Sequence, residues 1–299
     1  MPNALARLIP DLHLSRRASS TAQWTTLWRA LELARPPEQR IVTDQFAPLF
    51  LTDAYRAVLS GLRAGRRVLR VAERAELAGL AAYALCRHRF IDEHLLTELA
   101  GGAEQLLILG AGYDSRAYRF ATELTGRPVY EVDLAPTSRR KAAIVAAHPD
   151  DFPAGRVNRV EIDFRTDSLA DSLLAAGFAV GARTVVIWEG VTMYLSGDAV
   201  RATLQTVRQV CGASSTLAMD LWHELHGGVR DDVRRIGAKA ISLIGEPVTF
   251  GIAPDALPAL LQDAGFSVSE LLQWQELERR YATDGRHCEP SLYVVAARL

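Results

Sequence analysis

The chain of 299 residues has few of the features that mark specialised protein classes. It contains only three cysteines, Cys86, Cys211 and Cys288, which lie far apart in the sequence. This spacing excludes a disulfide framework and a Cys-x-x-Cys metal site, and no metal is predicted. One cysteine could act as a nucleophile, but three buried, unreactive thiols are the better expectation.

The chain also lacks an excess of charge and a long apolar run. Its 34 basic and 35 acidic residues give a formal net charge of −1, which gives no electrostatic support for a nucleic-acid or membrane partner. The short basic runs 63–70 and 139–141 are predicted to be solvated helix faces. No segment resembles a signal peptide or a membrane span. We therefore expect a cytoplasmic monomer or homodimer.

The apolar residues that are present change their pattern near residue 100. Before it they recur at helical spacing in residues 24–34, 55–62, 73–86 and 90–99. After it short apolar runs alternate with amphipathic segments, which is typical of a parallel sheet covered by helices on both faces. The predicted strands are 106–109, 129–132, 157–162, 184–188, 216–219, 267–271 and 292–296.

No linker divides the chain, but two boundaries are predicted from this pattern. Residues 1–100 form a helical extension and residues 101–299 form the core. Residues 221–252 are polar and long for a connection between a strand and a helix. Long loops of this kind are usually functional, so we expect a helical lid here, with a plain surface helix as the alternative.

A glycine turn follows the first predicted strand. Gly110, Ala111 and Gly112 connect it to a segment, residues 116–124, with a helical pattern. Glycines at this place let a ligand approach the backbone, and in an open α/β sheet ligands bind there. The turn alone is a weak signal. Ser115 occupies the position of the third glycine in the dinucleotide fingerprint, which argues against NAD or FAD.

Acidic residues follow the next two strands. Asp133, with Leu134 beside it, can accept both hydroxyls of a ribose; a helix cap is the alternative, made weaker by the nearby Pro136. Asp163 can accept from an exocyclic amino group while Phe164 lies against a purine. By itself Asp163 would more often be a cap. Together with the glycine turn, these residues indicate an adenosine site without a diphosphate, and hence S-adenosylmethionine.

In three multi-residue motifs the sequence resembles the leucine carboxyl methyltransferase-like family. This family includes bacterial O-methyltransferases associated with polyketide synthesis. Residues 109–119 resemble its LGAGxDTRxxR motif, residues 130–141 its xEVDxP…RK motif and residues 188–195 its xxEGxxMYL motif. Further matches at residues 29–36, 44–47 and 87–92 extend the resemblance from about residue 19 to the C-terminus. It implies the class I methyltransferase fold, Rossmann-like, with a seven-stranded, mostly parallel sheet.

The resemblance also implies roles that spacing does not reach. Arg87 would hold the methionine carboxylate of the cofactor, and Glu189 would face its amino group or the methyl acceptor. The residues implied on the acceptor side are Arg29, Tyr194, Phe250 and Tyr281. Without the resemblance, Arg87 is a surface helix arginine and Tyr194 a core aromatic. Gln45 and Pro136 depart from the family pattern. These departures weaken the prediction of the entrance to the acceptor pocket, but they do not affect Asp133 as the residue that binds the ribose.

Methyl transfer from a sulfonium depends mainly on alignment in a site that excludes water. A carboxylate acceptor needs no general base, whereas a hydroxyl acceptor benefits from one. His223 and His226, at the start of the expected lid, are the candidate bases, with Tyr194 as a further catalytic candidate. Either histidine is more often a surface residue than a base.

The predicted function is S-adenosylmethionine-dependent O-methylation of a carboxylate or hydroxyl on a small molecule, such as a polyketide. The alternatives are methylation of a protein C-terminal carboxylate, an NAD-dependent oxidoreductase, and a cofactor-binding sensor or partner subunit without activity.

Overall fold

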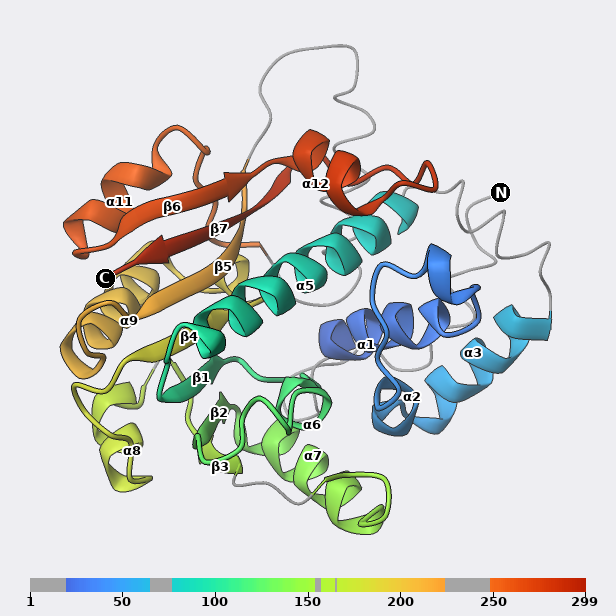
Figure 1. Cartoon of the computed structure of the whole chain (residues 1–299), viewed down its shortest axis with the longest axis horizontal. Coiled ribbons are helices and arrows are strands. Elements are labelled where there is room, and N and C mark those ends of the chain that lie inside the picture. The colour runs from blue at the N-terminus through green and yellow to red at the C-terminus, as the bar shows by residue number, and fades with distance from the viewer. Residues whose placement is uncertain (1–19, 65–76, 154–156, 165, 224–247) are drawn as a thin grey trace.

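The computed structural model describes residues 20–64, 77–153, 157–164, 166–223 and 248–299. Within these residues, a seven-stranded sheet has the order β3-β2-β1-β4-β5-β7-β6 (Figure 1). Only β7 runs antiparallel to its neighbours. The predicted strands and the mostly parallel sheet are confirmed. The strands are β1 (Gln105–Leu109), β2 (Val129–Asp133), β3 (Val157–Glu161), β4 (Thr184–Trp188), β5 (Thr216–Trp222), β6 (Ser267–Leu272) and β7 (Leu292–Arg298).

The sheet is buried on both faces because its central strands are mostly apolar. In β1 and β4 every residue is buried, and successive side chains enter two different cores. One core is covered by α5 (Leu77–Ala100), α6 (Arg116–Arg119), α7 (Ala135–Ala147) and α12 (Trp274–Tyr281). The other is covered by α8 (Leu169–Ala175), α9 (Gly197–Val210) and α11 (Leu257–Asp263). Helices therefore lie on both faces, as predicted.

Two helical predictions need correction. The patterns at 73–86 and 90–99 meet in one helix, α5, because no proline or glycine interrupts residues 80–99. This helix crosses one face of the sheet and contacts β4, β5 and β7 (Figure 1), although it was assigned to the extension 1–100. The helix expected at 116–124 ends at Arg119 and continues as turns to Gly126.

The remaining N-terminal helices pack beside the sheet rather than on it (Figure 1). They are α1 (Ser20–Glu32), a single 3-10 turn (Pro37–Gln39), α2 (Ala47–Phe50) and α3 (Asp53–Ala64). Their small shared core contains Leu27, Ala30, Ala47, Leu51 and Leu59. Among the helices of the described ranges, none is long and apolar enough to cross a membrane. Most of the expected lid, residues 224–247, lies outside the described residues.

Two expectations about side chains can be checked directly. All three cysteines are buried and unpaired, as expected. The prediction that residues 139–141 form a solvated face is wrong for Lys141, whose side chain is 1% exposed. Its ammonium lies 2.8 Å from a Glu131 carboxylate oxygen on β2. The pattern could not reveal this because a buried lysine requires a partner from a different element.

A buried ion pair fastens the N-terminal helices to the segment after the glycine turn. Arg29 on α1 donates to Asp44 at 2.8 Å and to the Tyr113 carbonyl oxygen at 2.8 Å. Asp44 also accepts from the Ser115 hydroxyl at 2.7 Å and from the amides of Phe46 and Ala47 at 3.1 Å. Asp44 is fully buried, so it depends on these donors for stabilisation of its charge.

We expect the R29M substitution to lower the free energy of unfolding by about 3–5 kcal/mol, because Asp44 would remain buried without its cationic partner. Urea denaturation followed by far-UV circular dichroism measures the change. The matched control is R139M, which removes an arginine that is bonded to Glu161 on the surface and should leave the free energy of unfolding close to that of the wild type. Equal effects of the two substitutions would contradict the anchoring role of Arg29.

Candidate functional site

The predicted glycine turn lies at the carboxyl end of β1, between β2 and β4. The chain passes from β1 to β2 on one side while β4 lies on the other, and ligands bind at such a switch point in open α/β sheets. The amides of Gly110 and Ala111 both donate to the Val132 carbonyl oxygen, at 2.8 and 3.0 Å. Gly110 has φ +68°, and a Cβ atom there would overlap the Val191 side chain. Both its conformation and its surroundings therefore require glycine.

Asp133, at the end of β2, is held directly against the turn. One carboxylate oxygen accepts from the Gly112 amide at 2.5 Å and the other from the Leu134 amide at 2.7 Å. Burial raises the pKa of Asp133 to about 6, although these two amides act to lower it. The Leu134 side chain beside it is 46% exposed. The structure thus brings together Gly112, Asp133 and Leu134, which the sequence singled out separately.

The two residues predicted to contact the adenine base of the cofactor follow β3. The Ile162 amide donates to the Asp133 carbonyl oxygen at 3.0 Å, which places the following Asp163 beside the end of β2. Asp163 is partly buried, and its amide donates to Asp167 at 2.8 Å. Phe164 packs against the core beneath α8 and α9. Their position next to Asp133 suits the predicted contact with a base, and that contact stays a prediction.

Glu189, immediately after β4, is held by donors from two helices. Arg87 Nε on α5 donates to one carboxylate oxygen at 2.9 Å, and Arg116 Nη1 on α6 donates to the other at 2.7 Å. His88 Nδ1 lies 3.1–3.2 Å from both oxygens. Burial would raise the pKa of Glu189, but the charges of Arg116 and Arg87 hold it well below its usual range. Glu189 is therefore an anion at neutral pH.

Arg87 connects this carboxylate to a second one on β5. Its Nη1 donates to Asp220 at 2.6 Å, and the other oxygen of Asp220 accepts from the Gly190 amide at 2.5 Å. Burial raises the pKa of Asp220, while the Arg87 charge and the Gly190 amide lower it. The Arg87 guanidinium also lies 5.7 Å from the centre of the Tyr83 ring. The predicted Arg87 and Glu189 therefore meet at the end of the sheet.

Several residues of this cluster were missed by the sequence analysis. Arg116 is completely buried and donates to Asp92 at 2.7 Å and Asp114 at 2.5 Å as well as to Glu189. Arg119 donates to Asp92 at 2.7 and 2.9 Å. The sequence contained a sign of these residues, because they are charged residues inside motifs whose segments are otherwise buried. Among the charged residues of segments 87–92 and 109–119 only Arg87 was predicted to have a role, and Asp220 lay beyond the predicted strand 216–219.

The cluster carries a formal negative charge. Three arginines, 87, 116 and 119, face four carboxylates, those of residues 92, 114, 189 and 220. One negative charge remains when His88 is neutral. Burial would raise the pKa of Asp92 and of Asp114, but the neighbouring arginines lower both below the usual value. This end of the site therefore favours a ligand with net positive charge.

The residues expected on the acceptor side lie on separate segments of the fold, and their contact with an acceptor stays a prediction. Arg29 is engaged by Asp44 and Tyr113. Tyr194 lies in the turn after β4 (Thr192–Tyr194), three residues beyond Val191. Phe250 packs near Gly197, and its amide lies 3.3 Å from the Met193 carbonyl oxygen. The Tyr281 hydroxyl donates to Glu93 on α5 at 2.8 Å.

His223 follows β5 directly, and its amide donates to the Ser291 carbonyl oxygen at 2.9 Å. Its ring packs 5.7 Å from the Tyr293 ring. Its role as a base stays a prediction. His226 lies outside the described residues.

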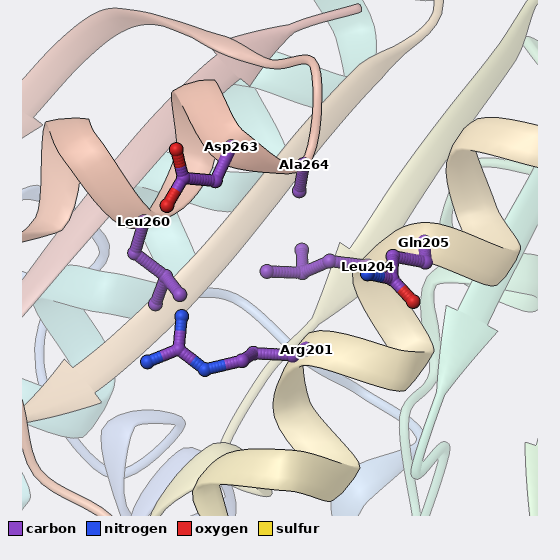
Figure 2. A pocket seen from close by; sticks show the side chains of 6 residues that line it. All are labelled: Arg201, Leu204, Gln205, Leu260, Asp263 and Ala264. Atoms are coloured by element: carbon purple, nitrogen blue, oxygen red, sulfur yellow. The ribbon is translucent and has the colours of Figure 1, made fainter.

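A small cavity between α9 and α11 is separate from this cluster (Figure 2). Its volume is about 50 Å³, which suits one or two water molecules rather than a nucleoside. Figure 2 shows Arg201 and Asp263 directed towards it from the two helices. The glycine turn, Asp133 and Glu189 do not line it.

Comparison with known proteins identifies the family. The profile of the leucine carboxyl methyltransferase family matches residues 22–208. The chain belongs to this family. A relative from Parafrankia sp. is 32% identical over 84% of this chain and 77% of its own length. One from Mycobacterium tuberculosis is 32% identical over 69% of this chain and 66% of its own, just under two thirds.

Both relatives are named as S-adenosyl-L-methionine-dependent methyltransferases on the basis of inference. Their cofactor is the one that was predicted from the sequence. Among solved structures, a DUF574 family protein from Streptomyces avermitilis has a TM-score of 0.61. It is 15% identical over 94% of this chain and 97% of its own. That likeness concerns the fold, and it confirms the predicted Rossmann-like class.

We expect the G110A substitution to destabilise the protein more than G126A does, by about 1–3 kcal/mol. Gly110 and Gly126 have similar positive φ angles, +68° and +77°, but a Cβ atom meets nothing within 4 Å at Gly126. The difference therefore isolates the overlap with Val191. Thermal unfolding monitored by calorimetry measures it. The double variant G110A/V191A should recover part of the loss, and an equal loss in G110A and G126A would contradict the close approach.

Proposed function

We propose that this protein is an S-adenosylmethionine-dependent O-methyltransferase whose acceptor is a carboxylate of a small molecule. The observation that carries the proposal is the cluster around Glu189 beside the glycine turn, with its one excess negative charge. S-adenosylmethionine has a sulfonium, an ammonium and a carboxylate, so its net charge is +1. A dinucleotide has a diphosphate, which this cluster would repel.

The residues present fit the parts of this cofactor. Asp133 keeps lone pairs for the ribose hydroxyls beyond the amides that fix it. Glu189 suits the ammonium group. Arg87 commits Nε and Nη1 to Glu189 and Asp220, which leaves Nη2, on the side of Gly190, to donate to the cofactor carboxylate. Asp163, Phe164 and Leu134 lie where an adenine would follow the ribose.

The bound cofactor supplies an electrophilic methyl group on sulfur, and the protein aligns the acceptor with it. Among the described residues around Glu189, each carboxylate is paired with an arginine and His88 is buried between charged partners. None of them is placed to remove a proton from an acceptor. A carboxylate acceptor needs no such step. This favours a carboxylate over a hydroxyl, and Tyr194 remains a candidate for orienting it.

Two other acceptors belong to the same proposal as alternatives. A hydroxyl of a polyketide-like small molecule would need a base from outside the described cluster. A protein C-terminal carboxylate would suit the name of the family profile. An NAD-dependent oxidoreductase is disfavoured by Ser115, whose buried hydroxyl bridges Asp44 and Arg119 in place of the third fingerprint glycine.

We expect the affinity for S-adenosylhomocysteine and for 5′-methylthioadenosine to fall about tenfold between pH 7 and pH 5. The ionised Asp133 accepts the ribose hydroxyls, and with a pKa of about 6 it becomes protonated over this range, which removes the acceptor. Isothermal titration calorimetry measures both ligands, with NAD as the comparison ligand expected not to bind.

The D133N variant should bind both adenosine ligands roughly 10–100-fold more weakly at pH 7 and without this pH dependence. The matched control is E161Q, at the exposed end of the neighbouring strand β3, which should behave as the wild type. An unchanged tenfold dependence in D133N, or tighter binding of NAD than of the adenosine ligands, would reject the assignment.

We expect turnover with S-adenosylmethionine on small apolar carboxylic acids and little on the matching phenols or alcohols. Mass spectrometry of product esters and ethers over matched pairs of acceptors gives the rates. Peptides with a free C-terminal carboxylate test the protein-acceptor alternative. Faster reaction of phenols than of acids would overturn the carboxylate assignment, and binding of cofactor without turnover on any class would favour a sensor or partner subunit.

A further inference from the structure

His88 is a buried histidine that contacts the proposed cofactor site, and no role has been assigned to it so far. It follows Arg87 on α5 and is 4% exposed. Its Nδ1 lies 3.1 and 3.2 Å from the two carboxylate oxygens of Glu189. Its Nε2 lies 2.8 Å from Nη2 of Arg119. The ring therefore stands between an anion on one side and a cation on the other.

These two contacts together favour one tautomer of the ring. A guanidinium can only donate, so Nε2 must be the unprotonated nitrogen that accepts from Arg119. The ionised Glu189 can only accept, so Nδ1 must carry the hydrogen. Nη2 of Arg116 lies 2.9 Å from Nδ1, but it also donates to the His88 carbonyl oxygen at 3.1 Å. The consistent assignment is a neutral imidazole that donates from Nδ1 to Glu189.

The surrounding charges favour this neutral form. Arg116 and Arg119 face the ring from α6, Asp92 from its own helix, and Glu189 from the end of β4. Burial lowers the pKa of His88 and the charge of Arg116 lowers it further, although Glu189 and Asp92 act in the opposite direction. Asp114 and Arg87 lie one contact further away, bonded to Arg116 and Glu189.

A neutral donor at this place has a specific consequence for Glu189. Arg87 and Arg116 each occupy one carboxylate oxygen, and His88 lies close to both. The third donor restricts rotation of the carboxylate without adding a third positive charge. The carboxylate thus keeps more of its attraction for a cation than it would beside another arginine or lysine.

We propose that His88 is a positioning residue which, as a neutral donor, holds Glu189 in the orientation that binds the ammonium group of the cofactor's amino-acid portion. This inference rests on the proposed function, because it presupposes S-adenosylmethionine at this site.

Two substitutions separate positioning from packing. H88L keeps much of the volume of the ring but removes both nitrogens. H88N places an amide donor near the position of Nδ1 and removes the ring. In both variants Arg119 keeps its bonds to Asp92 and Ser115, and Glu189 keeps its two arginines, so we expect both proteins to fold.

Two ligands separate the ammonium end of the site from the rest. S-adenosylhomocysteine carries the amino-acid portion, and 5′-methylthioadenosine has the same adenine and ribose without it. Calorimetry at pH 7.5 should show about tenfold weaker binding of S-adenosylhomocysteine to H88L and unchanged binding of 5′-methylthioadenosine. H88N should bind S-adenosylhomocysteine within about threefold of the wild type, because its amide keeps a donor near Glu189. The tenfold loss in H88L corresponds to the contribution of one hydrogen bond to a charged group.

The tautomer is measured independently by nuclear magnetic resonance of ¹⁵N-histidine-labelled protein. The chain has seven histidines, and the signal that disappears in H88N identifies residue 88. We expect a neutral ring protonated at Nδ1.

Equal weakening of both ligands in H88L, full affinity of H88L for S-adenosylhomocysteine, or protonation at Nε2 would each overturn the inference. If the wild type bound neither ligand, the proposed function would fail first, and this inference with it. If the wild type binds both ligands and only the H88L pattern is absent, the proposed function stands and the positioning role fails.

Discussion

The organisation of the site depends on a guanidinium that has no access to water. Arg116 is completely buried, and an ion removed from solvent is stable only with excellent geometry and nearly complete hydrogen bonding. Its partners come from α5, from the turn before α6 and from the end of β4. Because one side chain needs all three, it fixes the relative positions of the helix carrying Arg87, the glycine turn and Glu189.

The same requirement extends outward to the N-terminal helices. Arg119, one helical turn after Arg116, donates to the Ser115 hydroxyl, which in turn donates to Asp44. Arg29 completes this chain of contacts from α1. Ser115 therefore does more than depart from a dinucleotide fingerprint. A glycine there would leave both Asp44 and Arg119 short of a partner, so the residue that argues against a diphosphate also attaches the N-terminal helices to the site.

The sequence predicted the strands and the glycine turn well because both depend on local properties. An apolar run of four to six residues between helical patterns has few alternatives to a buried strand, and Gly110 and Asp133 each follow one directly. The ion-pair network could not be predicted in this way. The partners of Arg116 lie 2, 24 and 73 residues away, so their pairing depends on topology. Lys141 was misplaced for the same reason, since it needs a buried acid from a different element.

The neutralisation of opposite charges in the reaction supports a carboxylate acceptor more strongly than the family name does. Transfer of a methyl group from a cationic sulfonium to a carboxylate converts two opposite charges into two neutral products. A buried site that excludes water favours such mutual neutralisation, because separated charges are the less stable state there. Transfer to a neutral hydroxyl instead leaves a proton that must depart. The arginines lower the pKa of Glu189 and of the neighbouring Asp92 and Asp114, and His88 is held neutral between Glu189 and Arg119. A proton released there would have to disrupt one of these contacts, whereas a carboxylate acceptor releases none.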